Sequence, residues 1–248
     1  LPAWWILGTN TQKITPIDVG GGSEEYIYNI RTSPDGAVML VNWTDRLQQH
    51  LKVMAIDLET GSCRLVIDEQ QPTWQTNSPA MRYLADHERF IWTSESSGFS
   101  HYQLRHLNGD LIHHLSSGEF QASGIEYVDE ESSQMGFLGF SSPVNPYYMQ
   151  YHVVGLDGSN QRRVTTLDFH HSSFQLSPDK KWLVAQYEEV NTPPSTALYS
   201  TEGKLIARLA EGDPAAAANI AEMFSFRSND DQHDIYGILY KPKDFDPT

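Results

Sequence analysis

Short stretches in which apolar and polar residues alternate run along most of this 248-residue chain. Such alternation predicts β-strands with one buried face, and the Gly, Pro, Asn and Asp residues between the stretches favour turns. From residue 26 the stretches fall into four successive groups of four. The expected strands are Tyr26–Arg31, Ala37–Trp43, Leu51–Leu58 and Arg64–Ile67; Met81–Ala85, Arg89–Ser94, His101–His106 and Leu111–Leu115; Gly124–Val128, Met135–Phe140, Tyr147–Val154 and Arg162–Thr166; and Ser173–Leu176, Trp182–Tyr187, Ala197–Ser200 and Leu205–Leu209.

Turn glycines recur at a regular spacing. Gly61, Gly109, Gly158 and Gly203 are separated by 48, 49 and 45 residues, and the sequence Ser-Pro-Asp at 33–35 returns at 177–179. Repeats of roughly 40–50 residues made of short strands indicate the blades of a β-propeller. We therefore predict an all-β fold, a partial β-propeller of about four four-stranded antiparallel blades.

The pattern also divides the chain. Residues 23–212 are expected to hold the four blades, at about 23–70, 71–118, 119–168 and 169–212, while 1–22 are interpreted as the outer strands of a preceding blade. Residues 213–248 are interpreted as a linker and the first strands of a further domain. There, Asp213 before Pro214 predicts a short helix through Glu222, and Glu222–Arg227 with Ile235–Tyr240 predicts a hairpin.

Charge and cysteine content exclude some partners. Lys and Arg number 17 against 32 Asp and Glu, a formal net charge of -15. Such a surface repels phosphates, so neither nucleic acid nor a membrane is expected as a partner.

Cys63 is the single cysteine, which excludes an intramolecular disulfide and suits the cytoplasm or a bacterial periplasm, with the periplasm preferred. The chain has no initial Met, basic leader or long apolar run, so we expect neither signal peptide nor membrane span, and a piece of a larger protein.

One motif carries a family resemblance. Trp92, Ser94, Glu95, Gly98 and His101 match a Phe/Trp-x-Ser-Glu-x-x-Gly-x-x-His segment of the dipeptidyl peptidase IV branch of the prolyl oligopeptidase-like serine peptidases. The family's next two motifs follow at 109–111 and 115–120, with Phe where a Trp is usual. Three weaker matches, at 42–48, 145–158 and 237–247, stand in the family's order. From about Tyr26 onward the chain resembles this family.

The resemblance implies the second half of an eight-bladed propeller that ends where an α/β-hydrolase domain begins. The parent would be a serine exopeptidase that removes N-terminal Xaa-Pro or Xaa-Ala dipeptides, with the propeller restricting entry to short peptides. Its partners would be the hydrolase domain of the same parent chain and peptide substrates. The alternative is a non-catalytic propeller that binds a protein or peptide, and another peptidase branch of the superfamily stays open. A four-blade arc also predicts that two copies associate, each completing the other's ring, or that neighbouring molecules cover its bare faces.

The residues themselves offer no complete catalytic set. A hydrolase nucleophile needs the Gly-x-Ser-x-Gly elbow, and the nearest sequence, Gly139–Pro143, ends in Pro. We therefore expect no catalytic residue in this chain and no activity of the chain alone. A parent of this family grips the substrate's amino terminus with two Glu residues, for which Glu24 and Glu25 are weak candidates. Asp129–Glu131 and Glu188–Glu189 are interpreted as surface charge.

The histidines do not suggest a metal site. His87-Glu88 lacks the second His of a zinc-binding helix, and the adjacent pairs at 113–114 and 170–171 would face opposite sides of a strand. His101 is expected to hydrogen-bond the Ser94–Gly98 turn, a structural role. The sequence shows neither a glycine-rich phosphate loop nor a basic stripe, and no cofactor or metal is expected.

Overall fold

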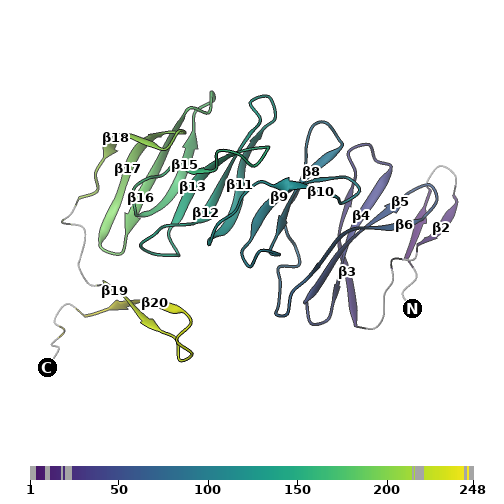
Figure 1. Ribbon diagram of the computed structural model, residues 1–248, viewed down its shortest axis with the longest axis horizontal. Coiled ribbons are helices and arrows are strands. Elements are labelled where there is room, and N and C mark those ends of the chain that lie inside the picture. Colours follow the sequence, from purple (N-terminus) through teal and green to yellow (C-terminus); the bar gives the residue numbers. More distant parts are fainter. Residues whose placement is uncertain are drawn as a thin grey trace. The chain divides into compact units, whose positions relative to one another are not determined.

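The chain folds into short antiparallel sheets that follow one another along the sequence (Figure 1). The computed structural model describes residues 4–8, 12–17, 19, 24–213, 215, 221–242 and 245. Its strands are β1 (Trp4–Leu7) and β2 (Ile14–Ile17); β3 (Glu25–Thr32), β4 (Val38–Asp45), β5 (His50–Asp57) and β6 (Cys63–Gln70); β7 (Met81–Tyr83), β8 (Arg89–Ser94), β9 (His101–His106) and β10 (Leu111–His114); β11 (Gln121–Asp129), β12 (Gln134–Phe140), β13 (Met149–Gly155) and β14 (Arg162–Arg163); β15 (His170–Leu176), β16 (Trp182–Glu189), β17 (Thr192–Ser200) and β18 (Lys204–Ala210); β19 (Ala221–Arg227) and β20 (Asp234–Tyr240).

Four of the sheets have four strands each, paired in sequence order: β3 to β6, β7 to β10, β11 to β14 and β15 to β18. This up-and-down order is that of propeller blades, and the prediction of a partial all-β propeller is confirmed. β1 and β2 form a separate two-stranded sheet, as do β19 and β20. Within the described part of the chain, no helix has the length and hydropathy that a membrane span needs.

By its internal contacts the chain divides into two compact units. The first comprises Leu1–Ser123, Tyr127–Met135 and Val154–Gln161, and the second comprises Gly124–Glu126, Gly136–Val153 and Arg162–Thr248.

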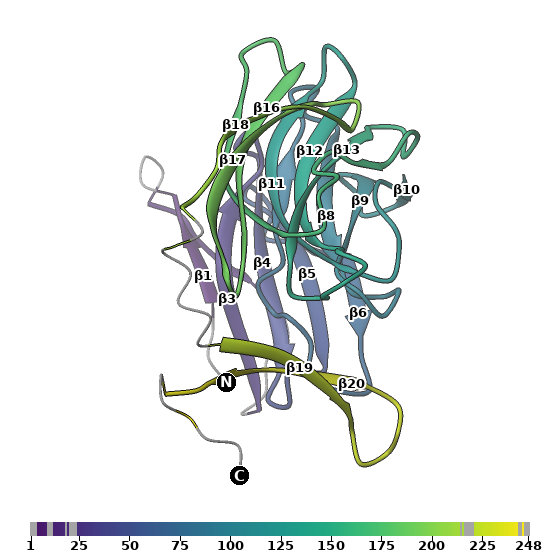
Figure 2. The same cartoon turned by 90° about the vertical axis from the view of Figure 1, so that its left-hand side faces the viewer.

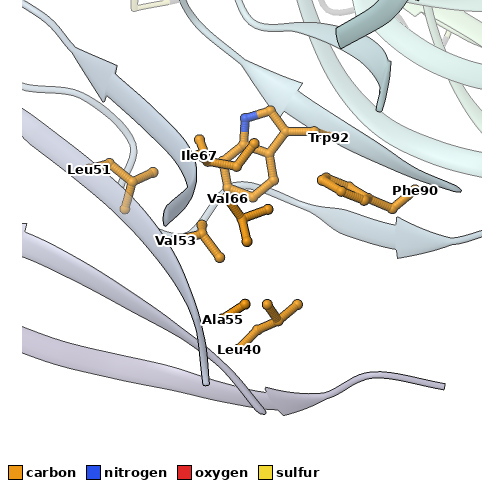
Figure 3. Close-up of a cluster of buried hydrophobic side chains, with 8 residues drawn as sticks. All are labelled: Leu40, Leu51, Val53, Ala55, Val66, Ile67, Phe90 and Trp92. Atoms are coloured by element: carbon orange, nitrogen blue, oxygen red, sulfur yellow. The ribbon is translucent and has the colours of Figure 1, made fainter. Parts of the chain in front are cut away.

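In the first unit, the sheet β3–β6 is buried on both faces. The consecutive residues Leu40 and Val41 of β4 belong to two different apolar clusters, because neighbouring side chains of a strand point to opposite faces. Val41 packs with Ile17 of β2, whereas Leu40 lies in a cluster with Phe90 and Trp92 of β8 (Figure 3). Covering on both faces explains why β4 is buried almost continuously.

The repeated turn glycines lie where two sheets touch. Gly109, in the turn between β9 and β10, has φ +101°, and a Cβ built there would come within 1.8 Å of the Val66 carbonyl oxygen of β6. The same turn of the other sheets likewise approaches a backbone carbonyl oxygen of the preceding sheet: Gly61 meets Pro16, Gly158 meets His114 and Gly203 meets Arg163. The glycine spacing seen in the sequence is therefore the spacing of these contacts between sheets.

The second unit holds β15–β18 and the β19–β20 hairpin (Figure 2). His171 of β15 is fully buried, and its Nδ1 and Nε2 lie 3.0 Å from the Phe169 carbonyl and 2.9 Å from the Tyr199 hydroxyl. In the neutral ring, Nδ1–H donates to the carbonyl and Nε2 accepts from the hydroxyl. Burial lowers the pKa of His171 to about 4 and raises that of Tyr199.

Several strand ends differ from the prediction. β14 holds only Arg162 and Arg163 rather than extending to Thr166. β13 begins at Met149, because the Asn145 side chain accepts a hydrogen bond from the Tyr147 N–H and shapes a turn there.

β17 begins at Thr192, five residues earlier than predicted. It accommodates Pro193 and Pro194 because the pairing with β16 is irregular there: the register shifts between Tyr187 and Glu189, where the missing proline N–H groups are tolerated.

The tail holds the predicted hairpin, since β19 and β20 pair over seven residues each. The predicted helix falls largely outside the described residues. At its predicted first turn, the Ala215 N–H donates to the Asp213 carboxylate at 2.9 Å. Its predicted end is wrong: Ala221 and Glu222 belong to strand β19, where they pair with Tyr240 and Leu239.

Candidate functional site

The family-like segment from Trp92 to His101 runs from the end of β8 into β9. Trp92 is fully buried against the first four-stranded sheet, and its indole N–H donates to the Glu69 carboxylate of β6 at 3.0 Å. Burial raises the pKa of Glu69, an effect that the hydrogen bonds from Ser94 and Trp92 oppose. The tryptophan therefore joins two neighbouring sheets by both apolar packing and a hydrogen bond.

Glu95 holds the segment between β6 and β7, which connects these two sheets, through hydrogen bonds. Its carboxylate accepts hydrogen bonds from the Thr76 N–H at 3.1 Å and the Thr76 hydroxyl at 2.8 Å, and its carbonyl accepts one from the Gln71 side chain at 3.0 Å. Gly98 closes the turn, since its N–H donates to the Glu95 carbonyl and its φ is +92°. Ser94 accepts from the Ser96 N–H at 3.2 Å. The Ser-Glu-x-x-Gly spacing thus builds a turn that also holds the incoming chain.

His101 is buried, but its partners differ from the predicted ones. Its Nε2 lies 2.8 Å from the Gly118 carbonyl and its Nδ1 3.1 Å from the Ser116 hydroxyl, both beyond β10. The expected bond to the Ser94–Gly98 turn is replaced because β10 pairs with β9, which brings residues 116–118 beside the ring. Phe120, at the family's Trp position, meets the ring edge-on at 5.0 Å. Burial lowers the pKa of His101, so the neutral ring is favoured.

Of the two carboxylates expected to grip a substrate amine, Glu24 and Glu25, at least that of Glu24 is already paired. Glu24 pairs with Arg46 at 3.4 Å, and both side chains are about two-thirds exposed. Glu25 opens β3 opposite Asp45. The role of Glu24 and Glu25 in gripping an amine stays a prediction.

The other carboxylate groups have structural contacts. Asp129 accepts from the Glu131 and Ser132 N–H groups in a turn. Glu130, expected to be surface charge, also accepts a hydrogen bond from the Ala85 N–H at 2.6 Å. Glu189 accepts from the Thr192 hydroxyl at 3.0 Å.

Ser141, in the sequence nearest to a nucleophile elbow, has a histidine partner. Its hydroxyl lies 2.6 Å from Nε2 of His152, which is buried and stacks on Phe137 at 5.0 Å. An elbow places the serine between a strand and a helix. Here the segment instead leads from β12 toward β13, so the pair does not reproduce that geometry.

The remaining histidines flagged in the sequence are placed apart. His87 sits at φ +58° in the turn between β7 and β8, and the ring of His113 contacts the Leu156 carbonyl. His170 and His171 of β15 pair with different residues of β16, Glu188 and Tyr187. In the portion of the chain that is described, no group of three or more His, Cys, Asp or Glu is arranged to hold a metal ion.

Sequence reasoning missed two charged residues at this junction. Glu69 follows the apolar run Leu65–Ile67 of β6, and Arg105 of β9 donates to the Gln103 side chain and the Gly109 carbonyl. Burial lowers the pKa of Arg105, and the Glu69 charge opposes that effect. Both strands carry other polar and charged residues, CRLVIDEQ in β6 and HYQLRH in β9, so the sequence holds no signal that singles out these two charges.

Known proteins share this architecture. The family model for the "Dipeptidyl peptidase IV (DPP IV) N-terminal region" matches residues 3–194. A putative dipeptidyl aminopeptidase IV from Bacteroides ovatus superposes with a TM-score of 0.73 at 20% identity, over 96% of this chain and 37% of that one. Dipeptidyl peptidase 4 from Porphyromonas gingivalis gives 0.72 at 16% identity, over 99% of this chain and 35% of that one.

This chain therefore spans a little over a third of the length of these two solved proteins, whose likeness shows the fold. The family match covers more than half of the sequence, including the Trp92–His101 segment and all the strands from β1 to β16. The chain belongs to the dipeptidyl peptidase IV N-terminal region family.

Proposed function

We propose that this chain is a non-catalytic propeller part of a dipeptidyl peptidase IV-like serine exopeptidase. The parent removes N-terminal Xaa-Pro or Xaa-Ala dipeptides through an acyl-enzyme, and the propeller limits access to short or unfolded peptides. The observation that carries this proposal is the family match over residues 3–194. The limited share of the two solved relatives that the chain spans agrees with it.

The exposed apolar side chains of the β19–β20 hairpin support the proposal that the parent has a further domain. On one face of the paired strands the hairpin's apolar side chains are Phe224, Phe226, Ile235 and Leu239, which are 45%, 52%, 41% and 46% exposed. Apolar side chains gathered on one short hairpin favour burial by a partner surface. We propose that the hydrolase domain of the parent covers them.

Activity of the full parent reading frame tests the proposal. We expect the purified parent to release a chromogenic amine from an Xaa-Pro dipeptide amide, and the 248-residue chain alone to release none. A parent variant with Ala at the serine of its Gly-x-Ser-x-Gly elbow is the control for contaminating peptidases. A reading frame without such an elbow, or a parent without turnover, would reject the peptidase and favour a binding propeller.

Access is tested with substrates of different size. The parent should process a free tripeptide with Pro at its second position much faster than the same three residues at the amino terminus of a folded protein. Unfolding that protein should restore cleavage, because the gate acts on size and not on sequence. Equal rates on the folded and unfolded substrate would contradict gating by the propeller.

A further inference from the structure

A cavity of about 440 Å³ lies within the second compact unit. This volume is in the range of small-molecule sites. Its lining residues come from the turn before β13, the starts of β15 and β19, the turn after β16, and β20: Asn145, Tyr147, Tyr148, His170, Val190, Met223, Tyr236, Gly237 and Ile238.

Hydrogen bonds fix two walls of the cavity. The buried Asn145 side chain accepts from the Tyr147 N–H at 2.9 Å and donates to the Met223 sulfur at 2.8 Å, which ties the turn to β19. The Asn191 side chain donates to the Ala221 carbonyl and ties the turn after β16 to the same strand. These hydrogen bonds therefore hold the segments that line the cavity together.

Aromatic rings dominate the lining. Tyr147 and Tyr236 meet edge-on at 5.9 Å, and Tyr148 meets His170 at 6.2 Å. In an edge-on pair the edge of one ring covers one face of the other, so each ring keeps at least one face that its partner does not cover. The face of a tyrosine ring attracts a cation through its quadrupole. None of the lining residues of this cavity is a Lys or Arg.

A carboxylate adds to this preference. Glu189 precedes the lining residue Val190, and the Thr192 hydroxyl holds its carboxylate at 3.0 Å. Its charge helps raise the pKa of Tyr148, after the larger effect of burial. The whole chain has a formal charge of -15, so the long-range field also favours a cation.

We propose that this cavity binds a small organic cation, an alkylated ammonium group held between the faces of Tyr147, Tyr148 and Tyr236 with Glu189 as its counter-charge. The apolar substituents of the ammonium contact Met223 and Ile238, and its charge is balanced without a metal or cofactor. This inference does not rest on the proposed peptidase function.

A comparison of choline with its uncharged isostere 3,3-dimethylbutan-1-ol separates the contribution of the charge to binding from that of the shape. Each is titrated into the 248-residue chain at fixed ionic strength, and binding is followed by ligand-observed NMR. We expect choline to bind at least about tenfold more tightly than the isostere, the value of a partly desolvated cation–π contact with a nearby carboxylate. Equal affinity for the two, or no choline binding up to about 100 mM, would overturn the proposal.

Matched variants locate the site. Tyr236→Leu should weaken choline binding about fivefold or more, whereas Tyr240→Leu, on the same strand but outside the lining, should leave it unchanged. Tyr147→Leu is the second aromatic variant, and because Tyr147 is 62% exposed, its replacement preserves the fold. Glu189→Gln should weaken choline binding about threefold, while Glu202→Gln, at a 77% exposed side chain in the turn between β17 and β18, serves as the charge control. Loss of binding in Tyr240→Leu, or full binding in both lining variants, would contradict the assignment.

Discussion

Gly109 meets two constraints at one position. Its φ of +101° is unfavourable for residues with a side chain, and a Cβ there would lie 1.8 Å from the Val66 carbonyl oxygen. Gly36, in the turn between β3 and β4, shares the first constraint with φ +71° but has nothing within 4 Å of a built Cβ. A comparison of substitutions at the two glycines therefore separates the effect of backbone strain from the effect of the contact between sheets.

Gly109→Ala should lower the free energy of unfolding by about 3 kcal/mol, because backbone strain and overpacking add. Gly36→Ala should cost only about 1 kcal/mol, the strain alone. Chemical denaturation of the two variants measures the difference. Equal losses would show that the close approach to Val66 does not contribute.

His171 makes stability depend on pH. Its folded-state pKa of about 4 lies below the ordinary value of 6.5, so the unfolded chain binds the proton more readily. The stability contributed by the neutral ring is present above pH 6.5, falls as the pH drops through 6.5, and is fully lost near pH 4. Between pH 7 and pH 5 this residue alone should reduce the free energy of unfolding by about 2 kcal/mol.

Denaturation at the two pH values tests this linkage. The His171→Gln variant should be less stable at pH 7, because its packing and hydrogen bonds change, but its stability should depend less on pH than that of the wild type. His106→Gln, at an exposed position on β9, is the control and should keep the wild-type pH dependence. A pH dependence that survives in His171→Gln would assign it to other groups.

At the scale of elements, the alternation of apolar and polar residues predicts that a strand is present. Where the strand begins and ends depends on local hydrogen bonds. The alternating pattern predicted each strand of the four-stranded sheets because those strands bury one or both faces. The start of β13 could not be predicted, since it depends on how the Asn145 side chain folds back. Pro193 and Pro194 lie in the part of β17 that the sequence did not predict as strand, and the irregular pairing with β16 permits them there.

The candidate site was predictable as a segment but not as a set of contacts. The spacing from Ser94 to Gly98 predicted a turn, which the structure contains. The partner of Trp92 is Glu69 of strand β6, and the partners of His101 lie at 116–118, after β10. The local sequence around Trp92 and His101 does not predict these partners. The apolar cavity near Tyr236 depends on side chains from five separate segments, which no local pattern joins.

The junction between the first two four-stranded sheets depends on the Trp92–Glu69 hydrogen bond. Trp92→Phe should lower the free energy of unfolding by about 2 kcal/mol, because the buried Glu69 carboxylate loses its indole donor and keeps only the hydrogen bond from Ser94. Glu69→Gln should cost less, about 1 kcal/mol at pH 7, since an amide oxygen still accepts from the indole but the partly buried Arg105 loses its counter-charge. Thermal melts of both variants measure the effect, and a larger loss in Glu69→Gln than in Trp92→Phe would contradict it.

At the scale of the whole molecule, the isolated chain exposes apolar residues on its first sheet, β1–β2, and on the last of its four-stranded sheets, β15–β18. Trp5, Leu7 and Ile14 of β1 and β2 are 58–60% exposed, and Ile206 and Leu209 of β18 are 42% and 54% exposed. Exposed apolar side chains of this kind favour self-association. We expect light scattering to show dimers that form with increasing concentration.

The double variant Ile206→Glu/Leu209→Glu should shift this equilibrium toward the monomer. Leu47→Glu, which alters a 68% exposed residue in the turn after β4, is the control and should not change the association. A wild-type chain that stays monomeric at every concentration would exclude these faces as an interface.

The contact of each turn glycine with the sheet before it has a consequence for how such proteins grow. Every segment of 45–49 residues carries its own means of attachment to its predecessor and offers the outer strand that its successor needs. A gene that duplicates one segment would add a sheet already fitted to both neighbours. Lengthening or shortening the array therefore requires no new interface, only another copy of the same one.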